Sequence, residues 1–297
     1  MTTPETLRPV RTIGFVGLGV MGEPMCGHLA RRSGLRVLAS DLRAEPVARL
    51  ASDGVIGATL PEIAAACDLI LLSLPDGRAV QAVLSVLEPL LRPGQVVVDT
   101  STSPVAMTRA LGARLAERAI GFADAPIART REAASSGKLS IMVGATKTVF
   151  AHVRAVLETM GTDVSHCGPI GTGQVVKILN NMLVFQNVCA LAEAMALAAR
   201  NGVAADILLE TIAKGSGDSF VLRNHGMKSM LPGVFPERAF STRYAMKDLS
   251  YALEMAAADH LHLAGAELTM ARLIASDAAG NGDVYFPALM NLIGKAP

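Results

Sequence analysis

The order of hydrophobic and polar positions divides the chain into two parts. In the first part, short apolar runs alternate with segments of helical periodicity. The runs are predicted strands, at 12–16, 36–40, 68–74, 95–100, 120–123 and 139–143. Helices are predicted at 21–32, 45–52, 61–66, 78–91, 105–118 and 148–160. Runs such as 69–72 are apolar on both alternating faces, as in a parallel sheet covered by helices, so the pattern predicts a doubly wound α/β domain.

The pattern changes at the Gly/Pro cluster at 168–173. Beyond it the strand signal almost disappears, and Gly202 is a predicted helix stop. Long helices are predicted at 174–201, 204–214, 244–259 and 265–279. We therefore place a boundary near residue 170, with an α/β domain at 1–170 and an all-helical domain at 171–297 built around one long helix.

Composition and charge exclude several classes of partner. The chain has 27 basic and 26 acidic side chains, no Trp, and 4% aromatic residues. This balance argues against a nucleic-acid or anionic-membrane partner, and the low aromatic content argues against a base-stacking platform. The apolar stretch at 175–199 is interrupted by Lys177, Asn180, Asn181 and Glu193, which favours a helix buried in protein over a membrane span.

The cysteines and histidines do not form metal-site patterns. The four cysteines stand far apart with no CxxC pair, which argues against a zinc knuckle or a disulfide framework. His260 and His262 lie two positions apart in a helical context and so do not share a face, and no metal site is expected. The first eleven residues lack an apolar signal segment, and we expect a cytoplasmic protein.

A glycine-rich loop follows the first predicted strand and opens the first helix. Its G-x-G-x-x-G pattern consists of Gly17, Gly19 and Gly22. In this βαβ context the first glycine permits a tight turn, the second lets a pyrophosphate approach the backbone, and the third lets helix and strand pack closely. The alternative is an ordinary glycine-rich turn. The predicted cofactor-binding loop is Gly17, Leu18, Gly19, Val20, Met21 and Gly22.

Asp41 follows the second predicted strand, nineteen positions after Gly22. A carboxylate there can accept hydrogen bonds from an adenosine ribose and would repel a 2′-phosphate, which favours NAD over NADP. Arg43 leaves NADP open, because its side chain can fold back onto a phosphate. Asp41 can also act as a helix N-cap, which is compatible with cofactor binding.

Several ordered motifs resemble the β-hydroxyacid dehydrogenases, a family that includes 3-hydroxyisobutyrate dehydrogenases and tartronate semialdehyde reductases. They are GLGVMGEPM at 17–25, DTSTSP at 99–104, DAPI at 124–127, GKL at 137–139, MVG at 142–144, GQVVKILNN at 173–181 and KDL at 247–249. The resemblance implies a Rossmann-type domain, a helical domain and a substrate cleft between them. It also implies NAD(P)-dependent hydride transfer to or from a small anionic β-hydroxy acid or its semialdehyde.

Lys177 is the predicted proton donor and acceptor. An amine in a mostly apolar helix is costly unless it has a partner or a function, and a partly desolvated amine with a lowered pKa suits proton transfer. Asn180 and Asn181 follow three and four positions later on the same helix side. The resemblance assigns catalysis to this Lys and substrate orientation to a matching Asn. The alternative is a Lys that reaches from a buried helix to solvent.

Ser101 and Thr102 lie just beyond a predicted strand, at the sheet edge where ligands bind. The resemblance places the matching Ser near the substrate carboxylate and the nicotinamide; the alternative is a cap on the following helix. We also predict that Thr102, Leu74 and Pro75 line the cofactor site. The resemblance places Lys247 at the cofactor or the cleft, whereas the sequence alone would make it a surface lysine.

The chain departs from the family pattern after DAPI. Many members continue with Ser-Gly-Gly, whereas this chain has Ala128-Arg129-Thr130. A guanidinium forms forked bonds to oxyanions, so Arg129 and Thr130 are predicted to bind a substrate anion larger or more charged than a simple carboxylate. Sulfolactaldehyde reductases have a similar Gly-Arg-Thr, which suggests a three-carbon sulfonate. The alternative is that Arg129 faces solvent or a neighbouring subunit. Ser219 belongs to a segment that resembles the family's variable substrate loop.

Two other functions remain as alternatives: imine reduction on the same scaffold, and a non-catalytic NAD-binding protein. The intact glycine loop and Lys177 argue against the second. We expect a homodimer or homotetramer, because a small domain around one long apolar helix rarely covers both its flanks, and Ala-rich faces allow close helix packing.

Overall fold

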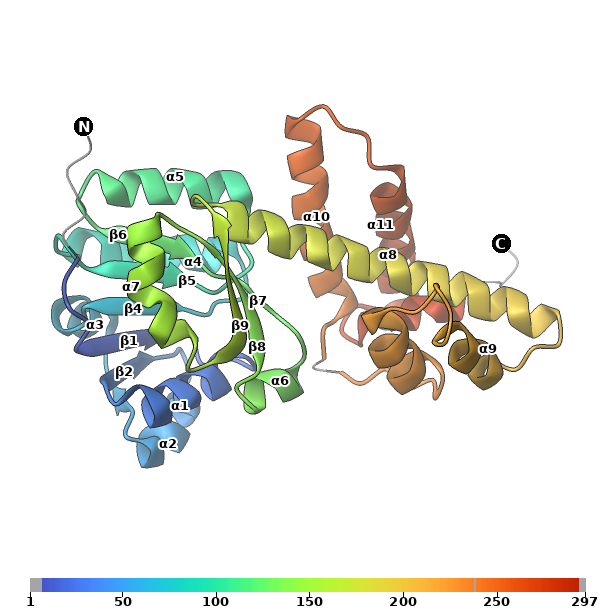
Figure 1. Ribbon diagram of the computed structural model, residues 1–297, viewed down its shortest axis with the longest axis horizontal. Helices are drawn as coiled ribbons and strands as arrows, with labels where there is room; N and C mark the ends of the chain where they lie inside the picture. Colours follow the sequence, from blue (N-terminus) through green and yellow to red (C-terminus); the bar gives the residue numbers. More distant parts are fainter. Residues whose placement is uncertain (1–6, 238, 294–297) are drawn as a thin grey trace. The chain divides into compact units, whose positions relative to one another are not determined.

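The structure is a computed structural model that describes residues 7–237 and 239–293 (Figure 1). The chain forms two compact units, the first ending at Lys177 and the second beginning at Ile178. The division falls inside one long helix, α8 (Thr172–Arg200), which begins just after the Gly/Pro cluster. The predicted boundary near residue 170 lies just before this helix.

The first unit is built on one mixed sheet with a parallel core. Its parallel strands run in the order β3-β2-β1-β4-β5-β6, and their direction of addition reverses between β1 and β4. Ligands of doubly wound sheets bind at that reversal, outside the carboxyl ends of the strands. The strands are β1 (Thr12–Val16), β2 (Arg36–Ser40), β3 (Ile56–Gly57), β4 (Leu69–Leu72), β5 (Val96–Asp99) and β6 (Gly121–Asp124).

Three further strands complete the sheet beyond β6. They are β7 (Ile127–Ala128), β8 (Leu139–Gly144) and β9 (Gly161–Gly168). β8 runs antiparallel to β6 and β7 and parallel to β9. The last residues of β6 and β8, Asp124 and Gly144, pair directly, so these two antiparallel strands meet at their carboxyl ends.

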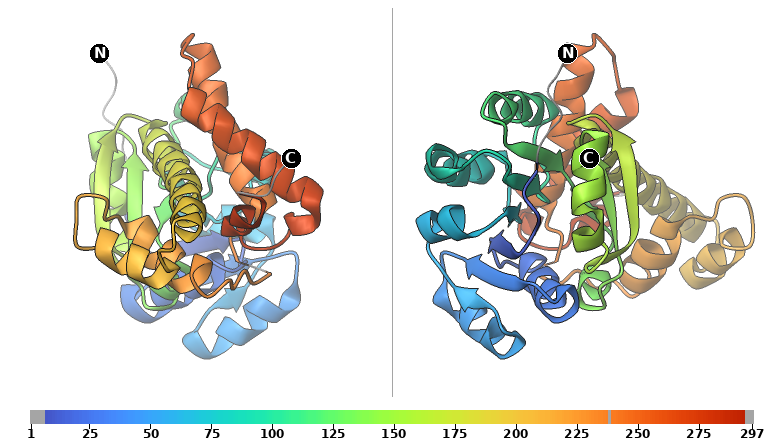
Figure 2. Two further views of the ribbon diagram at one scale, coloured as in Figure 1. Left: turned by 90° about the vertical axis from the view of Figure 1, so that its right-hand side faces the viewer. Right: turned by 60° about the vertical axis from the view of Figure 1, so that its left-hand side comes forward.

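Helices cover both faces of the sheet because its strands are apolar on both faces. Phe15 and Leu71 belong to one core with α1 and α7, whereas Ile70 and Leu72 belong to the other core with α3, α4 and α5. The right-hand view of Figure 2 shows α4 and α5 on one side of the strands and α7 on the other. The helices of this unit are α1 (Gly22–Ser33), α2 (Ala44–Leu50), α3 (Leu60–Ala66), α4 (Gly77–Leu87), α5 (Val105–Ala116), α6 (Arg131–Ser135) and α7 (Lys147–Leu157), with 3₁₀ turns η1 (Ala51–Asp53) and η2 (Glu88–Leu90).

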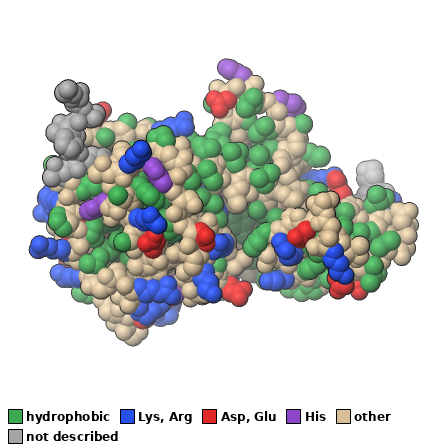
Figure 3. Space-filling view, viewed as in Figure 1, with side chains coloured by type: hydrophobic (Ala, Val, Ile, Leu, Met, Phe, Trp, Pro, Cys, Tyr) green, Lys and Arg blue, Asp and Glu red, His purple; other side chains and the backbone are tan. Residues whose placement is uncertain are grey.

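The second unit consists of helices joined by loops; its described residues form no strand longer than two isolated β-bridges, Glu237–Val284 and Ser241–Tyr285. It contains most of α8, followed by α9 (Ala205–Ile212), the π-helix η3 (Leu222–Met230), α10 (Thr242–Ala258), α11 (Ala264–Ser276), η4 (Asp277–Asn281) and η5 (Phe286–Leu292). Aromatic rings form its centre: Phe185 of α8 lies 5.2 Å from Phe286 and 5.8 Å from Phe240, between ring centroids. Hydrophobic side chains also gather on the outer surface of α8, α10 and α11, on the face shown in Figure 3.

Among the described residues, α8 is the one helix long and apolar enough to pass a length and composition test for a membrane span. About a third of its apolar window, 33%, is buried within the single chain. Phe185 and Met195 are buried, and Glu193 pairs with Arg272 of α11.

Candidate active site

The glycine loop has the geometry that its three glycines require. Gly17 has a φ of 96°, a conformation that side-chain-bearing residues rarely adopt. A Cβ on Gly22 would lie 2.0 Å from the carbonyl oxygen of Gly17, so only glycine allows α1 to pack this closely. A Cβ on Gly19 would meet nothing within 4 Å. The loop therefore leaves space where a pyrophosphate would approach the backbone, and the residues fit a dinucleotide.

Asp41 fastens the end of β2 to this loop. Its Oδ2 accepts a hydrogen bond from the Leu18 N–H at 2.6 Å, and its Oδ1 accepts from the Arg43 N–H at 2.9 Å. Burial pushes the pKa of Asp41 upward, but these N–H donors outweigh it and hold the pKa below its usual value. The carboxylate therefore stays ionised at the mouth of the predicted ribose site.

A hollow of about 330 Å³ lies beside Asp41. Small and apolar side chains form most of its wall, which suits a flat adenosine group, and Asp41 and Arg43 supply its charges. The lining residues are Ala39, Ser40, Asp41, Arg43, Ala44, Val47, Ala48, Gly57 and Ala58.

Two buried carboxylates mark the ends of the neighbouring strands β5 and β6. Asp99 and Asp124 are direct register partners, and their exposed fractions are 1% and 0%. Burial raises the pKa of each to about 6, against the hydrogen bonds that favour the ionised forms. Groups buried at such a cost at the ligand-binding edge of the sheet indicate a positional role.

Asp99 organises the loop after β5. Its Oδ1 accepts from the Ser101 N–H at 2.9 Å, and its Oδ2 accepts from the Ser103 hydroxyl at 3.2 Å. The hydroxyl oxygen of Ser101 in turn accepts from the Leu74 N–H at 2.9 Å. The structure thus brings Ser101 into contact with Leu74, and Thr102 is the next residue of the same loop. Ser101 is nearly fully buried, and its hydroxyl bonds the loop after β4. It does not cap the following helix, because α5 has Pro104 at its N-cap and no side-chain cap bond.

Asp124 holds the beginning of α8. Its Oδ1 accepts from the Gly171 N–H at 2.6 Å and its Oδ2 from the Gln174 N–H at 2.8 Å. These are N–H groups that a helix leaves without intrahelical partners, and a carboxylate is the group its dipole favours there. Lys177 follows Gln174 by three positions and is 9% exposed. The predicted catalytic amine thus stands near the anchored end of α8.

Asn180 and Asn181 continue the same helix into the second unit. The Asn180 amide donates to the Asn181 Oδ1 at 3.1 Å, and the Asn181 amide donates to the buried Asp248 of α10 at 2.6 Å. The ammonium of Lys247 lies 3.0 Å from the other oxygen of Asp248 and 4.1 Å from the centre of the Tyr244 ring. Lys247, which the sequence alone would place at the surface, thus belongs to a mostly buried polar cluster with both asparagines.

The remaining predicted site residues lie in local arrangements of their own. Arg129 donates to the Lys138 carbonyl at 2.8 Å and to the Thr162 hydroxyl at 3.0 Å, and it pairs with Asp163 at 2.7 Å. The Thr130 hydroxyl caps α6. The Ser219 hydroxyl accepts from the Leu222 N–H at 3.0 Å, at the start of η3.

Sequence reasoning missed four residues of these clusters: Asp99, Asp124, Gln174 and Asp248. Each lies inside a motif that carries the family resemblance, but only Asp248 is next to a residue that was singled out, Lys247. Their polar character within buried segments was the available signal, but their partners are far away in the chain.

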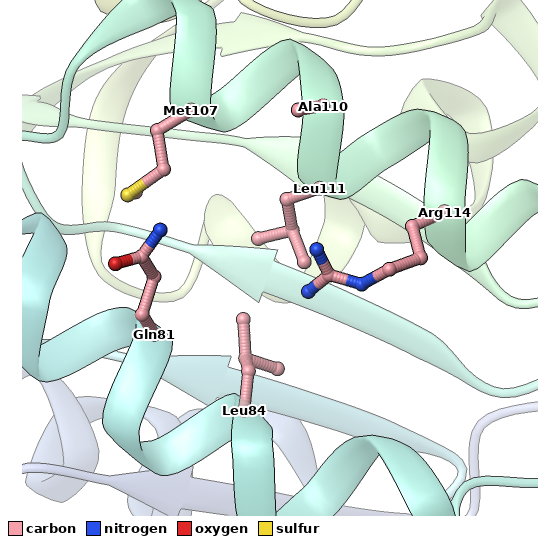
Figure 4. A pocket seen from close by; sticks show the side chains of 6 residues that line it. All are labelled: Gln81, Leu84, Met107, Ala110, Leu111 and Arg114. Carbon is pink, nitrogen blue, oxygen red and sulfur yellow. The ribbon is translucent and has the colours of Figure 1, made fainter.

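A second hollow, of about 140 Å³, lies between α4 and α5 (Figure 4). Gln81 and Leu84 from α4 and Met107, Ala110, Leu111 and Arg114 from α5 line it. The Arg114 Nε and Nη2 donate to the two oxygens of Glu88, each at 2.8 Å, so the charge of Arg114 already has a partner within the protein. Among the described residues, no group of three or more His, Cys, Asp or Glu is placed to hold a metal ion.

Two family models match consecutive parts of the chain. One, the NAD binding domain of 6-phosphogluconate dehydrogenase, covers residues 12–168. The other, described as the NAD-binding domain of NADP-dependent 3-hydroxyisobutyrate dehydrogenase, covers residues 171–293. The two matches meet where the sequence changes from α/β to all-helical.

Individual proteins are similar over most of their length. A 2-(hydroxymethyl)glutarate dehydrogenase from Eubacterium barkeri is 36% identical over 246 residues, which are 82% of this chain and 81% of that protein. An NAD-dependent L-serine dehydrogenase from Pseudomonas aeruginosa is 31% identical over 261 residues, 84% of this chain and 86% of that protein. A Mycobacterium tuberculosis 3-hydroxyisobutyrate dehydrogenase, solved with L-serine, has a TM-score of 0.87 and 29% identity, covering 96% of this chain and 99% of that one.

The family models, these relatives and the geometry of the glycine loop all indicate a dinucleotide-binding dehydrogenase. The predicted fold class, a Rossmann-type domain followed by a helical domain, is confirmed. The chain belongs to the β-hydroxyacid dehydrogenase family, as an NAD(P)-dependent dehydrogenase of the 3-hydroxyisobutyrate dehydrogenase type.

Proposed function

We propose that this enzyme interconverts a small anionic β-hydroxy acid and its semialdehyde, with Lys177 as the proton donor and acceptor. The observation that carries the proposal is the placement of a nearly buried amine one turn beyond an anchored helix end, in the unit that holds the dinucleotide loop. The nicotinamide, when bound, accepts or supplies the hydride. Lys177 takes the hydroxyl proton during oxidation and returns it to the carbonyl oxygen during reduction.

The test is Lys177→Ala, with the exposed Lys228→Ala as the matched control. We expect Lys177→Ala to lose about 10²- to 10⁴-fold in kcat, the range supplied by general acid–base catalysis, while NADH affinity stays close to that of the wild type. Lys228→Ala should retain full turnover. Wild-type turnover in Lys177→Ala would exclude this amine from catalysis.

We propose NAD as the preferred cofactor. The ionised Asp41 at the edge of the adenosine-sized hollow supports this, because a second negative charge on the ribose would face a carboxylate. Arg43 lies 3.4 Å from Asp41 and its side chain is 62% exposed, so it remains the group that NADP would use. The ratio of kcat/KM for NAD⁺ and NADP⁺ should exceed one in the wild type and fall in Asp41→Ser. A wild-type ratio below one would contradict the proposal.

We propose that Arg129 selects a substrate with a strongly charged anion, with a three-carbon sulfonate as the first candidate. The family resemblance implies glycine at the position of Arg129, and the φ of Arg129 is 86°, a conformation that favours glycine. Such backbone strain costs about 1–3 kcal/mol and often marks a functional position. The Arg129 guanidinium pairs with the Asp163 carboxylate. A substrate anion would compete with that carboxylate for the N–H donors of Arg129.

The test is a substrate panel on the wild type and on Arg129→Gly, a change that relieves the backbone strain. The panel holds dihydroxypropanesulfonate, 3-hydroxyisobutyrate, D- and L-glycerate, 3-hydroxypropionate and serine, with a cyclic imine and NADPH to test the imine reductase alternative. We expect the sulfonate to have the highest kcat/KM and to lose it selectively in the variant. If a carboxylate is preferred and Arg129→Gly changes nothing, Arg129 lies outside the anion site.

We also propose that the protein self-associates through the helical unit. Large apolar side chains there are well exposed in the single chain, among them Leu183 and Leu197 of α8, at 55% and 66%, and Leu268 of α11, at 55%. Exposed apolar helices of this kind are covered in stable homo-oligomers. Light scattering on the purified protein should give a multiple of the chain mass, and the double variant Leu183→Lys, Leu268→Lys should shift it to the monomer. A monomeric wild type would contradict the proposal.

A further inference from the structure

Gln174 is a fully buried polar side chain with a defined set of partners. Its Oε1 accepts from the Ser103 N–H at 3.1 Å, and its Nε2 donates to the Ser101 carbonyl at 2.8 Å. Its own backbone N–H donates to Asp124 at 2.8 Å. The residue is thus bonded on three sides, and its carboxamide bridges two segments that are 71 residues apart in the chain.

These two segments carry the groups that must act together. The loop at 101–103 holds Ser101 and Thr102 and is itself bonded to Leu74. The first turn of α8 leads to Lys177, three positions after Gln174 and therefore on an adjacent part of the helix surface. An apolar side chain could fill the same volume without burying an amide, so the bonds of Gln174 require a reason beyond filling space.

We propose that Gln174 is a positioning residue that fixes the first turn of α8, and with it Lys177, relative to the loop after β5. The inference rests on the proposed role of Lys177. Without the two carboxamide bonds, the end of α8 keeps its attachment to Asp124 but can rotate or slide against the loop at 101–103. Because a proton donor misplaced by about 1 Å can slow catalysis by about 10²-fold, a small displacement is enough to impair the reaction.

The chain contains a matched control in Gln95. This side chain is also 0% exposed, and it also bridges backbone groups: its Nε2 donates to the Ala64 and Cys67 carbonyls at 2.9 and 2.6 Å. Gln95, however, precedes β5, whereas the loop bonded to Gln174 follows β5. The two glutamines therefore serve opposite ends of one strand, and only one end is the ligand-binding edge.

The experiment compares Gln174→Met with Gln95→Met, two changes that keep side-chain volume and remove the bridging bonds. We expect both variants to lower the melting temperature. In Gln174→Met, kcat should fall by about 10²-fold while the KM for NAD⁺ changes by less than about twofold. In Gln95→Met, kcat should stay within about twofold of the wild type. Gln174→Glu, which keeps the acceptor for Ser103 and places a second acceptor against Ser101, should lose kcat in the same way and serves if Gln174→Met does not fold.

Hydrogen exchange supplies a second readout that does not depend on the substrate. In Gln174→Met the amides at 101–103 and 174–177 should exchange faster, whereas in Gln95→Met those segments should keep wild-type protection. The proposal is overturned if Gln174→Met keeps wild-type kcat and wild-type exchange at 101–103, or if Gln95→Met loses kcat equally. If the proposed function itself is wrong, Lys177→Ala keeps full turnover. The exchange result then still decides whether Gln174 couples the two segments.

Discussion

A single added carbon at Gly173 tests how closely α8 must approach the sheet. A Cβ at this position would lie 2.3 Å from the carbonyl oxygen of Met142, 2.8 Å from Asp124 Oδ2 and 2.9 Å from the carbonyl oxygen of Asp124. Two of these atoms belong to the backbone of strand β8 and strand β6, so no side-chain rotation removes the contacts. The first turn of α8 must therefore move away, by about 1 Å to reach an ordinary contact distance of about 3.5 Å.

The displacement acts on stability and on catalysis. Overpacking of this kind costs about 1–3 kcal/mol, which exceeds the roughly 0.5–1 kcal/mol that alanine gains over glycine inside a helix. We therefore expect Gly173→Ala to lower the free energy of unfolding by about 1–2 kcal/mol. Lys177 lies one turn further along the displaced helix, and a shift of about 1 Å is worth about 10²-fold in kcat.

The assays are urea unfolding and steady-state turnover on Gly173→Ala and on Gly226→Ala as the control. A Cβ on Gly226, in η3, would come no closer than 3.6 Å to any neighbouring atom, which is an ordinary contact. The control should keep its turnover and gain up to about 0.5–1 kcal/mol in stability, because alanine is the better helix former. If Gly173→Ala matches the wild type in both assays, α8 has room at its first turn, and the argument that links its placement to catalysis fails.

Three further predictions concern other parts of the molecule. Gly19→Ala should keep the wild-type melting temperature yet weaken NADH binding measured by fluorescence, whereas Gly22→Ala, whose Cβ would lie 2.0 Å from a backbone oxygen, should unfold at lower temperature. Equal effects of the two changes on stability would contradict this. Tyr285→Phe removes the hydroxyl that hydrogen-bonds the imidazole of His225 and should cost about 1–3 kcal/mol in urea unfolding, because a buried nitrogen loses its partner; a neutral change would show that water replaces the hydroxyl. Burial raises the pKa of Asp124 to about 6 from an ordinary 3.8, so the folded protein retains a proton there that the unfolded chain has lost. The stabilisation from the protonated Asp124 carboxyl is fully present below pH 3.8, the ordinary pKa, and is lost as the pH rises through about 6. Asp124→Asn should flatten that part of the curve of unfolding free energy against pH.

The alternating core of the fold is readable in the sequence because its signal is local. The runs predicted as strands contain β1, β2, β4 and β5 within two residues at each end, and the glycine pattern identified the turn into α1. Strands such as 69–72 are buried on both faces, so every residue in them is apolar and the run stands out.

The elements that were missed lack such a signal. β9 (Gly161–Gly168) is an edge strand whose side chains are mostly exposed or half-exposed, so its sequence is polar and resembles a loop. β3 and β7 are two residues long, and α6 is a five-residue helix. The π-helix η3 has a repeat that a search for 3.6-residue periodicity does not detect.

The site divides in the same way, between residues whose chemistry is local and residues whose role depends on a distant partner. The glycine loop and Asp41 could be predicted, because turn geometry and phosphate binding depend on the spacing of a few neighbouring residues. The proposed role of Lys177 came from an unusual residue in an apolar helix together with the family resemblance. That Asp124 anchors this helix could not be predicted. Its partners are 47 and 50 residues away in the chain, and neither the sequence around Asp124 nor that around α8 indicates the contact.

The carboxylates of Asp99 and Asp124, at the ends of β5 and β6, bind backbone N–H groups that an apolar side chain could not bind. An apolar edge would bury the same strands at less cost, but it could not bind the N–H groups at the start of α8 or in the loop at 101–103. Asp99 and Asp124 each collect such donors, and Gln174 joins the two sets. Because hydrogen bonds have direction and apolar contacts do not, this arrangement fixes the orientation of the helix end as well as its distance from the sheet. A reaction that must hold an amine within hydrogen-bonding reach of one oxygen atom needs that orientation, and the burial of two carboxylates is consistent with such a requirement.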